Sequence, residues 1–222
     1  KLSKRQNDVA VEDYIKNGYL KEAFINYLSL LGWHGSGDQE IYTFDELIKN
    51  FSFKRIQKSG AIFDIKKLNW MNNYYIKQLD PQEIFNEFVK NNKDLKDKIT
   101  LPMIRLVNEK IERFIDIREE LKFLFEYKLE NEKCRKILDR QNSKRVLKLF
   151  LSKLKKISKL DSKKFKTVVS EVQDEIKVNG KDLWMPIRIA VTGRMFGPDV
   201  ASIVEILGKE ACLQRLNDTI YD

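Results

Sequence analysis

Apolar residues recur at three- and four-residue intervals along most of the chain, which is the pattern of amphipathic helices. The first such region runs over residues 11–33, where Gly18 is expected to break a helix and Gly32 to end one. Further along, Thr43 stands three residues before Glu46, a capping-box spacing that predicts the start of a short helix. The beginning of the chain is therefore predicted to be helical.

Two more helices are predicted on either side of Asp80. The first covers residues 63–79, and one of its sides carries Leu68, Met71, Tyr75 and Leu79. For the second, Asp80 is the expected cap, Pro81 the first helical residue and Glu83 an acid in the first turn. We expect a boundary between two parts of the protein from about residue 79 to residue 100.

The second part shows the same periodicity. It predicts one or two helices over residues 101–125, and others over residues 144–157, 161–176, 182–193 and 198–220. Gly193, the Gly197–Pro198 pair and Gly208 punctuate the last part of the chain. Strand and hairpin signals are nearly absent, and no internal repeat is found. The predicted fold is all-α with two parts.

Composition excludes several classes of protein. The 222 residues are 42% hydrophobic and 34% charged, which is typical of a folded chain. No segment approaches the roughly 20 apolar residues of a membrane span, and we expect no signal peptide, no membrane and a cytoplasmic location. The missing initiator Met suggests a fragment. Cys134, Cys212 and His34 lack metal-ligand spacing, so we expect reduced thiols and no metal site.

The net charge of +9 favours a polyanionic partner, with nucleic acid first. The most basic segment, residues 144–166, carries ten cations against Asp161 alone. Apolar residues on one face of its helix are Val146, Phe150, Leu154 and Ile157. Two interpretations stay open: a solvated face over a packed stripe, which we favour slightly, or a surface that contacts phosphates.

Arginine can bond two acceptors on a base edge, which lysine cannot do. Arg188 and Arg194 stand on either side of "AVTG", close to a Gly-Pro break that would expose backbone N–H groups at a new helix start. An ion pair with a neighbouring helix is an equal alternative for Arg188. With one histidine, no paired carboxylates and no phosphate-binding glycine loop, the chain shows no complete catalytic site.

The chain opens with "KLSKR", a basic stretch that alone would be assigned to a disordered end. "GYLKEAFINYLSLLGW", "KSGAIFDIKKLNWMNNYYI" and "MPIRIAVTGRMFGPDVASIVEILGKE" follow it in that order. Together these stretches resemble the C-terminal half of a bacterial-type glutamyl-tRNA synthetase, a class I enzyme, and "KLSKR" is similar to its lysine-serine-lysine signature. The resemblance covers nearly the whole chain.

The resemblance implies an enzyme that activates glutamate with ATP and Mg and transfers it to the 3′ end of tRNA. Its Rossmann domain would precede residue 1. We expect the chain alone to be inactive, without a cofactor of its own, and to bind tRNA. The implied parts are residues 1–5 from the signature loop, residues 6–80 as a helical stem-contact region and residues 81–222 as an anticodon-binding domain, with a further division near residues 140–160. The glutaminyl relative is disfavoured because its anticodon-binding part is built from β-barrels.

In the signature, Lys4 falls on the second lysine, which in the family contacts ATP and stabilises the transition state for activation. Lys1, Ser3 and Arg5 fall on the remainder of the same ATP-binding loop. The resemblance therefore implies Lys4 as the catalytic residue and the other three as ATP-binding residues.

The implied tRNA-binding residues lie further along the chain. Lys67 and Trp70 match positions directed toward the D-stem. Lys110 aligns with a basic position that reads the anticodon and is often Arg in the family. Arg188 matches an anticodon-contacting arginine, and Gly197 and Val200 lie in the loop and helix start beside the anticodon. Arg194 joins this set as the second arginine near the Gly-Pro break.

The expected partner is tRNA(Glu), with tRNA(Gln) left open because Lys110 cannot make the bidentate contact of arginine. The protein is expected to be a monomer. A class I synthetase of the lysyl type would have the same fold and another cognate tRNA. A helical scaffold with a solvating basic surface is the alternative from a different class, and it predicts no salt-dependent association with tRNA.

Overall fold

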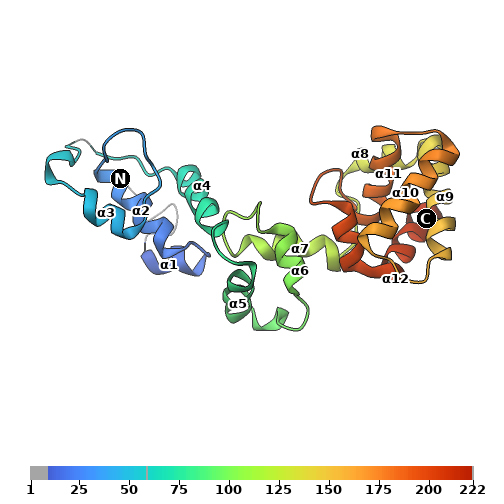
Figure 1. Ribbon diagram of the computed structural model, residues 1–222, viewed down its shortest axis with the longest axis horizontal. Helices are drawn as coiled ribbons and strands as arrows, with labels where there is room; N and C mark the ends of the chain where they lie inside the picture. The colour runs from blue at the N-terminus through green and yellow to red at the C-terminus, as the bar shows by residue number, and fades with distance from the viewer. Residues whose placement is uncertain (1–9, 59, 222) are drawn as a thin grey trace. The chain divides into compact units, whose positions relative to one another are not determined.

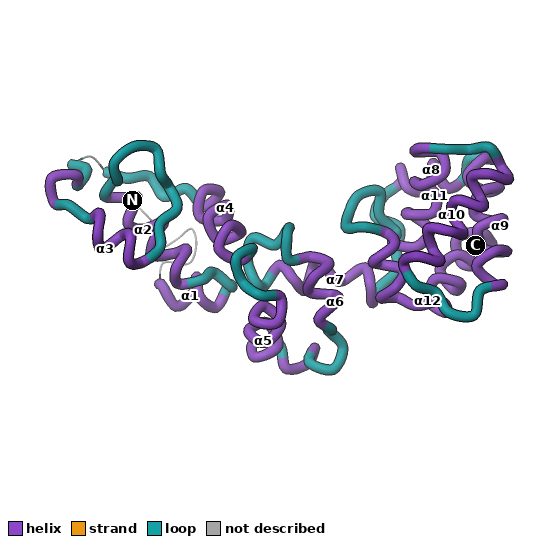
Figure 2. The backbone as a smooth tube through the Cα atoms, viewed as in Figure 1, coloured by secondary structure: helices purple, strands orange, loops and turns teal. Residues whose placement is uncertain are grey.

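The structure, a computed structural model, describes residues 10–58 and 60–221. Over these residues the regular elements are twelve α-helices and two short 3-10 helices, with no strand (Figures 1 and 2). Trp33 and Ile56 form an isolated β-bridge. None of the helices in the described ranges has the length and apolar character needed to span a membrane. The prediction of an all-α fold is confirmed.

The chain divides into two compact units, Lys1–Glu120 and Leu121–Asp222. The helix α7 (Asp116–Phe125) contributes residues to both. The functional boundaries expected near residue 80 and near residues 140–160 stay predictions.

The first unit contains short helices joined by loops (Figure 1). Besides the start of α7, its elements are α1 (Val11–Lys16), α2 (Lys21–Gly32), α3 (Phe44–Asn50), η1 (Phe53–Arg55), α4 (Ile65–Ile76), α5 (Pro81–Asn91), η2 (Lys93–Leu95) and α6 (Leu101–Val107). Both predicted capping boxes are present, from Thr43 to Glu46 before α3 and from Asp80 to Glu83 before α5. Local hydrogen bonding therefore sets these helix starts.

Aromatic side chains dominate the core of the first unit. Tyr14 packs against Phe24 with ring centroids 4.7 Å apart, and Tyr27 meets Phe63 edge to face at 5.1 Å. Helices α2 and α4 pack against each other, and Leu68 and Met71 from α4 complete the buried cluster. Burial of these rings supplies most of the stabilisation that such short helices need.

The second unit is a bundle of longer helices. Its elements are α8 (Glu132–Leu138), α9 (Gln141–Lys156), α10 (Ser162–Ile176), α11 (Gly180–Thr192) and α12 (Val200–Tyr221). The sequence pattern did not predict α8, which Asn131 caps by accepting hydrogen bonds from the N–H groups of Lys133 and Cys134. Gly208 interrupts α12 with φ 76° and ψ 171°, as expected for a punctuating glycine.

Helix α9 packs against α10, α11 and α12. Its stripe of Val146, Phe150 and Leu154 is buried. Phe150 meets Phe165 of α10 nearly perpendicular, with ring centroids 5.8 Å apart. The apolar stripe predicted for the basic segment is therefore a packed face, and the cations occupy its other sides.

Candidate nucleic-acid interface

Arg188 is a half-buried arginine near the end of α11. Its Nη2 atom donates a hydrogen bond to the carbonyl oxygen of Pro198 at 3.0 Å. Its Nη1 atom is buried and finds no hydrogen-bond partner among the described residues. Burial lowers the pKa of this guanidinium, an effect that the Asp199 carboxylate partly opposes. Because an arginine stays charged in proteins, Arg188 presents an unsatisfied cationic donor.

Arg215, on α12, shows how a buried arginine is satisfied in the same unit. Its Nη1 atom donates to the carbonyl oxygen of Val191 at 2.7 Å, and its Nη2 atom donates to that of Leu124 at 2.8 Å. Its guanidinium also lies 5.2 Å from the centre of the Tyr127 ring. Arg215 is therefore a structural residue. Arg188 differs because its Nη1 atom has no partner among the described residues.

Gly193 ends α11 with φ 73°, in the left-handed region that favours glycine. A Cβ atom at Gly193 would lie 2.1 Å from the carbonyl oxygen of Lys128, so only glycine fits there. Its own carbonyl oxygen accepts a hydrogen bond from the N–H of Glu130 at 2.9 Å. Thr192 adds a link, because its Oγ1 donates to the Arg188 carbonyl oxygen at 2.7 Å and accepts from Arg194 N–H at 3.1 Å. These contacts hold the turn after α11 beside Arg188.

Gly197 and Asp199 shape the loop before α12. Gly197 has φ 148°, and a Cβ atom there would lie 3.6 Å from Arg188 Nη1. Asp199 Oδ2 accepts hydrogen bonds from the N–H and the hydroxyl of Ser202 at 2.9 and 3.0 Å. Burial acts to raise the pKa of Asp199, but the hydrogen bonds from Ser202 and the charge of Lys166 outweigh it and hold the pKa below its ordinary value. The loop therefore starts α12 with an ionised cap.

The other two predicted residues of this region have different surroundings. The Arg194 guanidinium lies 4.9 Å from the centre of the Phe123 ring, a cation–π arrangement. Val200 is the first residue of α12, and its side chain is buried, so it packs in the core rather than facing solvent. No contact among the described residues joins Arg194 to Arg188. A nucleotide contact by either Arg194 or Val200 stays a prediction.

Phe196 is a residue that the sequence reasoning missed. Its side chain is 77% exposed, in the loop between Arg188's partner Pro198 and the end of α11. An exposed aromatic ring in the loop that Arg188 holds through Pro198 is suited to stacking on an unpaired base. The signal was present in the sequence, since "MFGP" places a large apolar residue directly before a Gly-Pro turn, where packing does not require one.

In the first unit, Lys67 and Trp70 stand three residues apart on α4 and so share one side of it. Lys67 Nζ pairs with the carboxylate of Glu40, and the Trp70 side chain is 47% exposed. The Lys67 ammonium group is thus already paired with a carboxylate, whereas about half of the Trp70 side chain is accessible to solvent. Their expected role at the D-stem stays a prediction.

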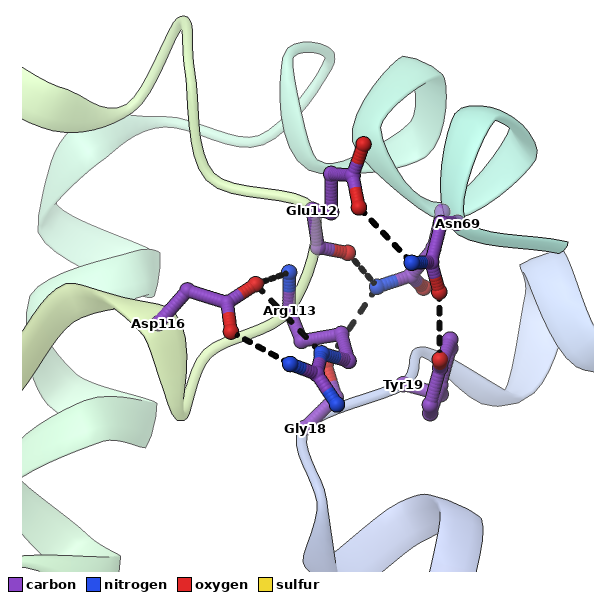
Figure 3. A network of polar contacts seen from close by, with 7 residues as sticks. Gly18, Tyr19, Asn69, Glu112, Arg113 and Asp116 are labelled. Carbon is purple, nitrogen blue, oxygen red and sulfur yellow. Dashed lines mark hydrogen bonds and ion pairs between the residues drawn. The ribbon is translucent and has the colours of Figure 1, made fainter. Parts of the chain in front are cut away.

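Lys110 lies in the loop between α6 and α7 and is exposed. A network of polar contacts holds this loop (Figure 3). Asn72 Nδ2 donates to the carbonyl oxygens of Glu112 and Gly18 at 2.6 and 3.3 Å, and Asn72 Oδ1 accepts from Leu20 N–H at 2.8 Å. Because Asn72 is buried, these bonds fasten the segment after Lys110 to α4 and to the turn before α2.

Arg113 completes the same network. Its Nη2 atom pairs with Asp116 Oδ1 at 2.8 Å, and the backbone N–H of Arg113 donates to Asp116 Oδ2 at 2.8 Å (Figure 3). Burial acts to lower the pKa of Arg113, but the charge and hydrogen bond of Asp116 outweigh it and raise the pKa. The loop that carries Lys110 is therefore held through residues 112–116, and the Lys110 side chain itself is exposed.

The cations of the basic segment, residues 144–166, fall into two groups, those paired with an acidic residue and those without such a pair. Lys153 Nζ pairs with Glu171 at 3.3 Å and with Glu175 at 3.1 Å, and Lys164 pairs with Asp161 at 3.8 Å. Lys153 thus joins α9 to α10, whereas the pair of Lys164 and Asp161 lies within the first turn of α10. Within the described part of the chain, the other cations of residues 144–166 have no acidic partner within 4.0 Å. They remain available to solvent or to phosphates.

Lys1, Ser3, Lys4 and Arg5 lie outside the described residues. Their assignment to an ATP-binding loop, with Lys4 as the catalytic residue, stays a prediction. Across residues 10–58 and 60–221, no group of three or more His, Cys, Asp or Glu residues could hold a metal ion.

Two families match the chain. The family described as "Anticodon binding domain" matches residues 65–220, and "tRNA synthetases class I (E and Q), catalytic domain" matches residues 1–70. The chain is similar to the glutamate–tRNA ligase of Clostridioides difficile, with 38% identity over 97% of this chain and 46% of that protein. It is also similar to that of Finegoldia magna, with 34% identity over 99% of this chain and 46% of that protein. The chain spans about half the length of these curated relatives.

Two solved structures share the fold. One is a glutamate tRNA ligase from Elizabethkingia meningosepticum in complex with its amino acid, with a TM-score of 0.82 and 26% identity over 98% of this chain and 44% of that one. The other is a glutamate-tRNA synthetase from Elizabethkingia anophelis, with a TM-score of 0.80 and 28% identity over 94% of this chain and 42% of that one.

The all-α fold and the family match together place this chain in the class of helical anticodon-binding domains of synthetases. The chain belongs to the anticodon-binding-domain family, in the form found in the C-terminal part of bacterial glutamate–tRNA ligases. The resemblance stated from the sequence is confirmed, and the lysyl-type and scaffold alternatives are not favoured.

Proposed function

We propose that this chain reads the anticodon of tRNA(Glu) through Arg188, as part of an enzyme that joins glutamate to tRNA at the expense of ATP. The observation that carries the proposal is the buried Nη1 atom of Arg188, which lacks a partner and lies inside the matched anticodon-binding domain. Because that atom is buried beside Gly197, the loop before α12 would shift to let the acceptor atom of a base edge satisfy this donor. A bidentate arginine contact is worth about 1–3 kcal/mol of discrimination, which is the upper limit for this single donor.

Phe196 supports the same function. An anticodon is single-stranded, so its bases can unstack and lie on an exposed aromatic ring. The 77% exposed ring of Phe196 offers such a face close to the loop that Arg188 holds. Arg188 would then distinguish the base while Phe196 adds affinity with little sequence preference.

The unpaired cations of residues 144–166, together with Arg194, would add phosphate contacts that carry no sequence information. Lys67 and Trp70 would meet the D-stem, and Lys110 would meet the anticodon from the first unit. Gly197 and Val200 would shape the turn on which the base rests. The first unit would thus contact the D-stem and the anticodon, and the second unit would contact the anticodon and nearby phosphates of the same tRNA.

In the full-length enzyme, ATP and Mg would supply the activation of glutamate. Lys1, Ser3, Lys4 and Arg5 would line the ATP side of that site, with Lys4 stabilising charge on the phosphates. The enzyme would act in the cytoplasm as a monomer, and both tRNA(Glu) and tRNA(Gln) are candidate substrates.

The test is a binding titration of the chain with tRNA(Glu), tRNA(Gln) and tRNA(Lys) at one fixed salt concentration. We expect tRNA(Glu) to bind more tightly than tRNA(Lys), and Arg188→Ala to remove about 1–3 kcal/mol of that difference. Arg188→Lys keeps the charge but lacks the planar fork, so it should also lose discrimination.

Arg118→Ala is the matched control, because Arg118 is an exposed arginine paired with Asp94 in the first unit. It removes the same charge and should leave the preference between tRNAs unchanged. Equal binding of tRNA(Glu) and tRNA(Lys) by the unaltered chain would contradict the proposed specificity. Activation of glutamate by this chain alone would contradict its assignment as the tRNA-reading part.

A further inference from the structure

A pocket of about 400 Å³ opens at the start of α9, apart from the Arg188 turn. The pocket is lined by Arg140, Gln141, Asn142, Ser143, Arg145 and Asp182. Only Arg145 has a role above, as one of the unpaired cations of residues 144–166.

The backbone in this pocket is the N-terminus of a sixteen-residue helix without a cap. Arg140 occupies the capping position with φ −62° and ψ 140°, and its side chain accepts no hydrogen bond. No acceptor in the described part of the chain takes the N–H groups of Gln141, Asn142 or Ser143. Three free donors at the positive end of a helix dipole favour an anion.

Ser143 adds a second donor to the same pocket. It is the third residue of α9, lines the pocket and is 4% exposed, and no hydrogen bond from residues 10–58 and 60–221 occupies its hydroxyl. Its oxygen is not fully buried, so a solute that enters the pocket can reach it, whereas most buried polar side chains already have a partner in the protein. A ligand acceptor in the pocket would take its proton.

The charges of the pocket favour an anion but limit its affinity. Arg140 and Arg145 have no carboxylate within 4.0 Å in the described residues. Asp182, in the first turn of α11, adds one carboxylate to the same lining. Two guanidinium groups against one carboxylate leave an excess of one positive charge, to which the helix end adds.

We propose that this pocket is a phosphate-binding site, in which the first-turn N–H groups of α9, the Ser143 hydroxyl and the guanidinium groups of Arg140 and Arg145 bind the phosphate oxygens. Planar guanidinium groups and free backbone N–H groups are the donors that phosphate prefers. The phosphate is either a backbone phosphodiester of RNA or a free phosphate ion. The RNA form rests on the proposed tRNA binding, whereas the free form does not.

The first arm of the test uses inorganic phosphate with the whole 222-residue chain at constant ionic strength. Backbone amide resonances of residues 141–143 should shift and saturate as phosphate is added. Arg145→Ala and Ser143→Ala should each weaken binding at least about threefold, because each removes a donor. Asp182→Asn should strengthen binding, because it removes the opposing charge.

The second arm measures the affinity for tRNA over a series of salt concentrations. Arg145→Ala should reduce the slope of log K against log [salt] by about 1, the loss of one phosphate contact. Arg135→Ala is the control in both arms, since Arg135 is an exposed arginine of α8 that is not among the pocket residues. It should leave the phosphate shifts unchanged.

The outcomes separate the two sources of phosphate. A slope change without binding of free phosphate supports the RNA form, and phosphate binding without a slope change supports the free form. Unchanged amide resonances together with an unchanged salt slope would overturn the site. Failure of all tRNA binding while phosphate still saturates residues 141–143 would contradict the proposed function and leave this site standing.

Discussion

The carbonyl oxygen of Gly18 accepts a hydrogen bond from the N–H of Phe114 at 3.1 Å, although the two residues stand ninety-six positions apart. A Cβ atom on Gly18 would lie 2.5 Å from that same nitrogen. Gly18 also has φ 86°, a conformation that other residues rarely adopt. The close approach therefore requires glycine, and it joins the turn before α2 to the loop that carries Lys110.

Gly18→Ala should destabilise the chain by about 2–5 kcal/mol, because it combines left-handed strain with a backbone clash. Urea unfolding followed by circular dichroism measures the change. Gly32→Ala is the matched control, since Gly32 ends α2 with no atom within 4 Å of an added Cβ. That control should be neutral or slightly stabilising. Equal effects of the two substitutions would refute the close approach.

Asn72→Ala should cost about 2–4 kcal/mol, because it leaves the buried polar groups of Gly18, Leu20 and Glu112 without their partner. Hydrogen exchange should also quicken in residues 108–115, which the side chain fastens to α4. Asn50→Ala is the control, since Asn50 makes one exposed bond to the carbonyl oxygen of Glu46. It should change stability by less than about 0.5 kcal/mol. Unaltered exchange in Asn72→Ala would argue against the network as the support of this loop.

Phe196→Ala should weaken tRNA binding by about 1–3 kcal/mol, the usual value of one stacked base, without lowering stability. Stability should hold because the side chain is largely exposed. Filter binding measures the affinity for tRNA, and thermal unfolding measures the stability of the variant. Phe53→Ala is the control, with an 82% exposed ring in the first unit. If Phe196→Ala binds tRNA as the unaltered chain does, the stacking role is excluded.

Lys110→Arg should increase the preference for tRNA(Glu) over tRNA(Gln), because arginine adds a bidentate fork that lysine lacks. The ratio of the two dissociation constants is the measured quantity. Lys96→Arg, at another exposed lysine of the same unit, should leave that ratio unchanged. A ratio unaffected by Lys110→Arg would remove Lys110 from the residues that read the anticodon.

Stability should fall in alkaline solution because of Cys212. Burial raises the pKa of its thiol from 9.0 to about 12, with a small opposing effect of Arg215. Above pH 9 the unfolded chain loses this proton while the folded chain keeps it, so the free energy of unfolding decreases from pH 9 toward pH 12. Burial likewise raises the pKa of Tyr75 from 10.0 to about 12, so the free energy of unfolding should decrease further as the pH rises above 10.

Urea unfolding at pH 8, 9, 10 and 11 under reducing conditions measures this dependence. Cys212→Ala should lower stability at pH 8, because it leaves a small cavity, but should flatten the decrease between pH 9 and pH 10. If the unaltered chain and Cys212→Ala showed the same pH dependence, the Cys212 thiol would not contribute to the loss of stability in alkaline solution.

Much of the fold could be predicted because its signals are local. A capping box joins residues three apart, so Thr43 and Asp80 mark their helix starts without reference to the rest of the chain. The stripe of Val146, Phe150 and Leu154 likewise follows from helix periodicity alone. The short α8 was missed because its seven residues offer too few turns for a periodic pattern, and an asparagine cap and packing stabilise it.

Candidate site residues could be named from the sequence, but their partners could not. Ordered motifs indicated Arg188, and only the tertiary structure decided that one of its donors bonds the Pro198 carbonyl oxygen while the other is buried without a partner among the described residues. The same holds for Asn72, whose partners lie 40 to 54 residues away. Sequence alone determined the helices and the family, because helix signals act within a few residues and motifs keep their order. Tertiary structure decided which polar groups are buried and which remain unsatisfied, because that depends on atoms brought together from distant parts of the chain.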